Sequence, residues 1–314
     1  MTEYWDGMLE RKMSEPKKHH FIPQFLLAEW AVNDGKLWRF SRPYGSKIAK
    51  KLVAPAEIGY QSQLYTTPGL PDGYTQQFEK AFLSKVDERA ARAHRLLMRD
   101  EPIDWTQPER SDWTRFIGSL FFRAPGNLTA YKDAVASVLK QETPAQQAAY
   151  LKDKPEHWPQ TLNEAMATMA PHWSEQAAME ILRGLIDDGH RGERINNMVW
   201  TVGEMNGGSE FLISDALLHH TTPLHMKGAY LILPISPTRL FVATNEGDDE
   251  TLNLFRSLDA NDLVQQVNRA VVRRAAVCVG ATSQDQRAFV EEHFAAEEYD
   301  TVIKGVARRY REEE

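Results

Sequence analysis

The sequence predicts an α+β protein that is mainly helical and carries an antiparallel β-sheet late in the chain. Through the first two thirds of the chain, apolar residues recur every three or four positions, which is the period of an amphipathic helix. After about residue 195 the pattern changes to alternation with period two, which is typical of strands with one buried face. Of the 314 residues, 42% are hydrophobic and 26% are charged, as in globular proteins with a core of their own.

This pattern predicts one α+β domain over residues 17–310, preceded by a flexible tail at residues 1–16. A boundary near residue 195, between a helical and a strand-rich part, is the alternative. The tail contains acidic residues and no apolar segment, so it does not resemble a secretion signal. The longest apolar run, "AYLILPI", is too short to cross a bilayer. We therefore expect a cytoplasmic protein without a membrane partner.

Charge and cysteine content limit the partners further. The net charge of −7 does not favour binding to nucleic acid, although basic segments such as "KIAKK" leave that partner open. The single cysteine, Cys278, excludes an internal disulfide and lies in the apolar run "AAVCVGA". We expect its side chain to be a small buried hydrophobic group.

The first predicted elements are short. Pro23 suits the first turn of a helix because its missing N–H would have no partner there, and Phe25, Leu26 and Trp30 follow at helical spacing. The segments "KLWRF" and "YQSQLYT" are expected to form strands at 36–40 and 60–66.

Two strong helices are predicted next. Over residues 74–98 a single apolar stripe recurs every three or four residues. The following helix begins at Thr106, with Glu109 three positions later as a capping box, and ends before Pro125. Weaker helices, rich in alanine and glutamine, are expected to be the least securely packed part of the chain at 127–141, 144–152, 160–169 and 175–187.

The strand-rich part contains two predicted hairpins. "NMVWTVGEMNGGSEFLISD" alternates on both sides of Asn206-Gly207, a dipeptide that tolerates the positive φ of a tight turn. Strands at 229–235 and 239–244 form the second pair, around Ser236-Pro237. A helix at 261–274, a strand at 276–281 and helices at 284–296 and 299–310 complete the expected order.

Five segments, taken in this order, resemble the bacterial domain-of-unknown-function family 4238. They are "HHFIPQFLLAEWA", "FFRAPGN", "FLISDALL", "LILPISPTRLFVAT" and "VNRAVVRRAAVCVGA", and together they extend from about Lys17 to Ala281. Leu217 stands where the family usually has a proline, so the turn after Asp215 departs from the family pattern. The resemblance implies a bacterial protein but supplies no activity, cofactor or site residue.

Four residues are the candidate site: His19, His20, Arg123 and Asp215. Each lies beside an apolar segment, at the edge of the core, where pockets form. We expect at most one histidine of the adjacent pair to enter a site, because neighbouring residues point in different directions. The histidine would be a base or metal ligand, Asp215 an orienting carboxylate or second ligand, and Arg123 an anion clamp. Structural roles are the alternative, with Arg123 at a negative helix end and Asp215 capping a turn.

A divalent metal cofactor stays open. His219, His220 and His225 lie close together in "HHTTPLH", a spacing that is compatible with metal binding without being diagnostic. "HHFIP" also resembles the start of ββα-metal nucleases, but a helix follows at once and the asparagine and histidine continuation of that motif is missing. The sequence contains no phosphate loop, nucleophile elbow or dinucleotide fingerprint.

Two functions follow from these observations, and the sequence leaves open whether the chain is an enzyme. The first is a hydrolase that acts on a phosphoester or acyl substrate in a polar pocket of histidine, arginine and aspartate. The second is a non-catalytic binding or regulatory protein, related to bacterial defence or toxins, whose motif residues tie strands to helices.

Overall fold

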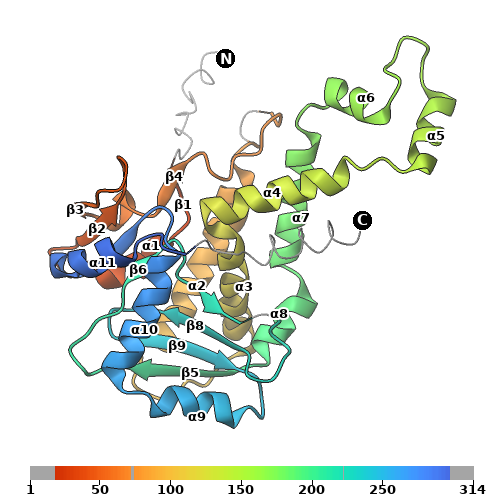
Figure 1. Cartoon of the computed structure of the whole chain (residues 1–314). Coiled ribbons are helices and arrows are strands. Elements are labelled where there is room, and N and C mark those ends of the chain that lie inside the picture. Colours follow the sequence, from red (N-terminus) through yellow and green to blue (C-terminus); the bar gives the residue numbers. More distant parts are fainter. Residues whose placement is uncertain (1–17, 72–73, 222, 298–314) are drawn as a thin grey trace, which may run out of the picture.

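Figure 1 shows the computed structural model of the chain, which describes residues 18–71, 74–221 and 223–297. The fold is α+β and mainly helical, with antiparallel strand pairs throughout, as the sequence predicts. The expected tail at 1–16 and the helix at 299–310 lie outside the described residues. Within the described ranges, no helix is long and apolar enough to span a bilayer.

The N-terminal motif forms a strand and then a short helix. β1 (Lys18–His20) pairs with β4 (Tyr60–Ser62), and α1 (Gln24–Leu27) continues into the 3-10 turn η1 (Ala28–Trp30). Gly59 adopts a φ of +67°, and its carbonyl accepts hydrogen bonds from the N–H groups of Phe21 and Ile22. β4 lies within the strand predicted at 60–66, whereas β1 was not predicted because three residues give no readable alternation.

A four-stranded sheet joins the two ends of the described chain. Its order is β3-β2-β10-β6, all antiparallel, with β2 (Leu37–Ser41), β3 (Ala49–Val53), β6 (Ile213–Ser214) and β10 (Val279–Ala281). The predicted strands at 36–40 and 276–281 are confirmed. β3 overlaps the segment "KIAKK". It is an edge strand that was not predicted, because its lysines interrupt the apolar pattern. Between β3 and β4 lies the 3-10 turn η2 (Pro55–Glu57).

Long helices follow these strands in the chain. The π-helix η3 (Phe78–Leu83) leads into α2 (Ser84–Leu97), which packs against α3 (Gln107–Arg123). The predicted capping box is confirmed, since Thr106 Oγ1 accepts from Glu109 N at 3.4 Å and Glu109 Oε2 accepts from Thr106 N at 3.0 Å. After a one-residue break at Ala124, α4 (Pro125–Leu139) leaves in a new direction.

The next four helices form an arm that extends away from the strands and then returns to them (Figure 1). They are α5 (Pro144–Asp153), α6 (Leu162–Met169), α7 (Trp173–Ile186) and α8 (Gly189–Asn196). α5 contains no buried residue and α6 contains only Ala165, which agrees with the expected weak packing, whereas α7 buries five residues and does not. α8 was not predicted.

The third sheet corrects one hairpin and confirms the other. Its order is β5-β9-β8-β7, with β5 (Val199–Glu204), β7 (His219–His220), β8 (Tyr230–Pro234) and β9 (Arg239–Thr244). β8 and β9 pair around Ser236-Pro237 as predicted. The hairpin at Asn206-Gly207 is wrong, because β5 pairs with β9 while β6 pairs with β10 in the other sheet. Both flanking segments alternate between apolar and polar residues as predicted, but each pairs with a strand of a different sheet.

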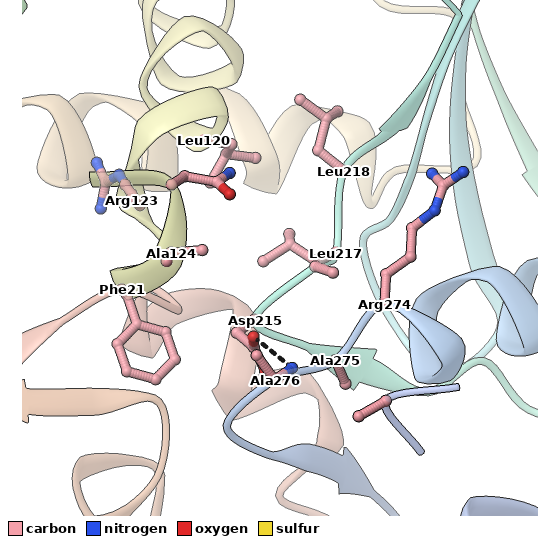
Figure 2. A pocket seen from close by; sticks show the side chains of 14 residues that line it. Phe21, Leu120, Arg123, Ala124, Asp215, Leu217, Leu218, Arg274, Ala275 and Ala276 are labelled. Carbon is pink, nitrogen blue, oxygen red and sulfur yellow. Dashed lines mark hydrogen bonds between the residues drawn. The ribbon is translucent and has the colours of Figure 1, made fainter. Parts of the chain in front are cut away.

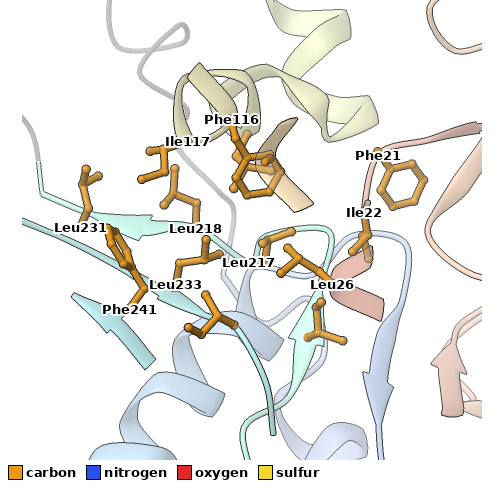
Figure 3. Close-up of a cluster of buried hydrophobic side chains, with 14 of the residues drawn as sticks. Phe21, Ile22, Leu26, Phe116, Ile117, Leu217, Leu218, Leu231, Leu233 and Phe241 are labelled. Atoms are coloured by element: carbon orange, nitrogen blue, oxygen red, sulfur yellow. The ribbon is translucent and has the colours of Figure 1, made fainter. Parts of the chain in front are cut away.

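Four further helical segments follow the strands: α9 (Asp249–Ser257), α10 (Ala260–Arg273), η4 (Gln284–Gln286) and α11 (Arg287–His293). α10 and α11 occupy the predicted positions, and α9 was not predicted. The largest core cluster includes residues from both sides of residue 195, from Phe21 to Cys278. Figure 3 shows part of it, where Phe116 and Ile117 of α3 lie near Leu217 and Leu218. The division into domains stays a prediction.

Candidate functional site

Arg123 is the last residue of α3, and its guanidinium is buried in a salt bridge. Only 2% of the residue is exposed. Nη1 and Nη2 donate to the two carboxylate oxygens of Asp87 at 3.0 and 2.5 Å, and Nε donates to Ser119 Oγ at 2.8 Å. Burial is the largest single influence and lowers the pKa of the guanidinium, but Asp87, Tyr65 and Glu79 together raise it above the ordinary value, so the arginine stays charged. The anion that Arg123 binds in this structure is therefore a carboxylate of its own chain.

His19 reaches the same region from β1. Its ring is fully buried, and Nδ1 accepts a hydrogen bond from the N–H of Tyr65 at 2.9 Å. The two rings stack, with centroids 5.7 Å apart and planes 7° from parallel. Tyr65 OH in turn donates to the carbonyl of Arg123 at 3.1 Å. Tyr65 thus connects the predicted histidine to the predicted arginine.

His20 points to the other side of β1. Its ring lies 5.6 Å from the ring of Tyr60, and its Nδ1 is 3.4 Å from Gln24 Nε2. Burial lowers its pKa to about 4, so it is neutral at physiological pH. Only one histidine of the pair therefore approaches Arg123.

Asp215 follows β6 and holds the turn before β10. Oδ2 accepts from the N–H of Ala276 at 2.9 Å, and Oδ1 accepts from Val277 and Cys278 at 3.0 and 3.1 Å. The residue is 8% exposed, and its burial raises the pKa of the carboxyl although the three N–H groups oppose this shift. Its contacts are those of a carboxylate that ties two segments of the chain together.

Arg123 and Asp215 line one cavity of about 230 Å³, named here the Arg123–Asp215 cavity (Figure 2). Its walls come from the α3–α4 junction, the segment after Asp215 and the end of α10, and its lining residues are Phe21, Leu120, Arg123, Ala124, Gly126, Asn127, Asp215, Ala216, Leu217, Leu218, Arg274, Ala275, Ala276 and Ala295. In Figure 2 the guanidinium of Arg123 lies on the side of α3 away from Asp215. His19 and His20 are not among the lining residues.

The sequence analysis missed Tyr65, Glu79 and Asp87. With His19 and Arg123 they form a connected group, which we call the Arg123 cluster. Burial raises the pKa of Glu79 to about 7, while Arg123 opposes the shift and Asp87 adds to it. Glu79 and Asp87 border the apolar stripe of η3 and α2. An acidic residue at the border of an apolar stripe is the sequence signal that could have identified them as site residues.

The later histidines lie near the cavity without assembling a metal site. His219 Nδ1 is 2.5 Å from Arg274 Nη1, and burial together with this arginine lowers the pKa of His219 to about 4. The ring of His220 lies 4.7 Å from that of Phe121. In the part of the chain that the structure describes, no three His, Cys, Asp or Glu side chains are placed to hold a metal ion.

Fold and site together define an α+β protein with a small cavity between a helix junction and a strand end, beside a buried cluster of charged and aromatic side chains. The chain belongs to the family described as "Protein of unknown function (DUF4238)", whose sequence model matches residues 18–285. The resemblance noted from the sequence is therefore confirmed. No curated protein and no solved structure matches the chain.

Proposed function

We propose that the chain is a binding protein and that the Arg123–Asp215 cavity holds a small ligand with an apolar body and one acidic group. The observation that carries this proposal is that residues from three distant segments, around Arg123, Asp215 and Arg274, line one cavity. Cavities of this kind, apolar with a few polar groups, are where proteins bind small molecules.

Size and lining support this class of ligand. The volume of about 230 Å³ lies below the range of about 300–1,000 Å³ that drug-sized ligands occupy, so the ligand would be small. Phe21, Leu217 and Leu218 offer apolar contact. Arg274 also lines the cavity, and in Figure 2 it stands on the other side of the segment that carries the two leucines, with its guanidinium directed away from Asp215. The guanidinium of Arg274 contacts His219 Nδ1 at 2.5 Å and lies 3.6 Å from Glu297 Oε1, so a carboxylate or phosphate in the cavity would take the place of Glu297 beside it.

The contacts of three of the four candidate residues support binding more than catalysis. Asp215 accepts three backbone hydrogen bonds, Arg123 is bound to Asp87, and His19 accepts from Tyr65 outside the cavity. Side chains held in this way stabilise the walls of a pocket. The hydrolase predicted from the sequence would need His19 or His20, Arg123 and Asp215 to act on one substrate, and it stays a prediction.

Titration of the full chain with sodium benzoate and with sodium phosphate, read as the melting temperature, tests the proposal. Benzoate has an apolar body and one acid, whereas phosphate has the charge alone. We expect benzoate to raise the melting temperature of the wild type and to have little effect on Arg274→Met. Arg273→Met is the matched control, because Arg273 is the neighbouring arginine on α10 and does not line the cavity. Equal responses of the two variants would refute the site.

The same preparations test the hydrolase. Turnover of p-nitrophenyl phosphate or p-nitrophenyl acetate by the wild type, lost in a folded His19→Ala variant, would favour catalysis over binding. Comparison of the metal-free protein with protein supplied with zinc or magnesium tests the open question of a divalent metal.

A further inference from the structure

Two side chains, one just before η3 and one in its first turn, carry buried oxygen atoms that accept no hydrogen bond from the described residues. Gln76 is 3% exposed, and its Nε2 donates to Thr66 Oγ1 at 2.9 Å. No residue in the described ranges donates to its Oε1, or to Oε2 of Glu79. Buried acceptors without a donor are costly and uncommon in native proteins, so each such oxygen requires an explanation.

Local geometry brings the two residues to one side of the chain. They are three positions apart on a helical turn, a spacing at which side chains are neighbours. The π-helix Phe78–Leu83 begins between them, and Ser84 Oγ donates to the carbonyl of Glu79 at 2.8 Å. π-helical turns are rare and are found frequently at functional sites.

The charges around Glu79 favour a cation. Arg123 is the buried cation that lowers the pKa of Glu79, but Asp87 already accepts two hydrogen bonds from this guanidinium. When Glu79 is ionised, the Arg123 cluster therefore contains two carboxylates and one guanidinium. Burial of the Glu79 carboxyl raises its pKa to about 7, while Arg123 opposes this rise and Asp87 adds to it. A second cation beside Glu79 would balance the charge and keep the carboxylate ionised.

Aromatic residues adjoin Glu79 in the chain. The ring of Phe78 lies 5.9 Å from that of Tyr65 and 5.4 Å from that of Phe82. Glu79 is partly exposed as a residue while its Oε2 is buried, so a ligand reaches this oxygen when the neighbouring side chains move aside.

We infer that Gln76 and Glu79 form a binding site for a ligand that carries an ammonium group, such as a primary amine. An ammonium has three N–H donors, which match the amide oxygen of Gln76 and the carboxylate of Glu79. A simple amine satisfies the two acceptors and adds the missing positive charge at once. This site is separate from the Arg123–Asp215 cavity, since neither residue lines that cavity, and it does not depend on the function proposed for the cavity.

Methylammonium chloride is the probe, and sodium chloride at equal concentration is its control. The melting temperature of the full chain is measured against both salts at pH 8 and at pH 5.5. Wild type, Glu79→Gln and Glu101→Gln are compared. Glu101 is an exposed glutamate outside the Arg123 cluster, so its variant controls for the loss of one negative charge.

The site predicts a saturable rise of the melting temperature with methylammonium at pH 8 in the wild type and in Glu101→Gln. In Glu79→Gln the apparent affinity falls about tenfold or more, because the ligand loses its charged partner. At pH 5.5 the wild type also binds about tenfold more weakly, since Glu79 is then protonated. Equal effects of methylammonium and sodium, or equal responses of the wild type and Glu79→Gln, would overturn the inference. If Glu79→Gln does not fold, the comparison of the two salts at the two pH values decides the matter alone.

Discussion

Replacement of Asp215 by alanine distinguishes a carboxylate that holds the fold from one that acts on a ligand. The side chain is 8% exposed and accepts the N–H groups of Ala276, Val277 and Cys278 at 2.9–3.1 Å. In the variant these three donors remain beside the cavity without their acceptor. Asp215→Asn is the milder change, because an amide oxygen can still accept two of the donors while its NH₂ group faces the third.

The expected loss of stability follows from these contacts. A hydrogen bond to a charged group contributes about 1.5–3 kcal/mol, but the burial of the carboxylate offsets part of the sum. We therefore expect Asp215→Ala to lower the free energy of unfolding by about 4 kcal/mol and Asp215→Asn by about 2 kcal/mol. Losses of this size are a large part of the total stability of about 5–15 kcal/mol that is usual for a domain.

Urea unfolding followed by tryptophan fluorescence measures both variants. Asp285→Ala, at an exposed position, is the control and should change stability by less than about 0.5 kcal/mol. If Asp215→Ala unfolds like the wild type but no longer binds benzoate, the carboxylate contacts the ligand. That outcome would refute the structural role assigned to Asp215.

Three further predictions concern the elements around the site. The Glu79→Gln variant should lose less stability than the wild type between about pH 5 and about pH 8. The pKa of Glu79 in the folded protein, about 7, lies above the ordinary 4.5, so protonation of this carboxyl stabilises the fold fully below pH 4.5. This contribution is about 3 kcal/mol at most, and the wild type loses it as the pH rises through 7. Urea unfolding of wild type and variant at both pH values measures the difference, and identical pH profiles would contradict it. Asp87→Ala leaves the buried guanidinium of Arg123 without its carboxylate and should cost about 3–5 kcal/mol in urea unfolding, whereas an exposed ion pair would cost less than about 1 kcal/mol. Gly59→Ala imposes a φ of +67° on alanine and places its Cβ 2.7 Å from Ile22 Cβ. It should therefore lower the free energy of unfolding by more than about 1 kcal/mol and lower the melting temperature. An unchanged melting temperature would show that this turn can relax.

Local signals predicted most of the helical part of the fold. The capping box at Thr106 and the break at Pro125 set the ends of α3 because both act within one turn of the residues that carry them. Strand pairing was harder, because a period of two shows which residues share a face but not which strand is the partner. The segments around Asn206 alternate correctly and yet join two different sheets.

The candidate site was predictable only in part for the same reason. Arg123 and Asp215 line one cavity because each ends an apolar element that faces the core. The contacts of Arg123 with Asp87 and of His19 with Tyr65 join residues 36 and 46 positions apart, and nothing local indicates them. Sequence reasoning thus located the edge of the core but could not show which charges are already paired there.

A crystal structure of the full chain in complex with benzoate tests the central claim most directly. The account predicts benzoate in the Arg123–Asp215 cavity, with its ring against Leu217 and Leu218 and its carboxylate near Arg274, while Asp215 and Arg123 keep their present partners. Benzoate bound elsewhere, or a ligand that takes Arg123 from Asp87, would contradict it.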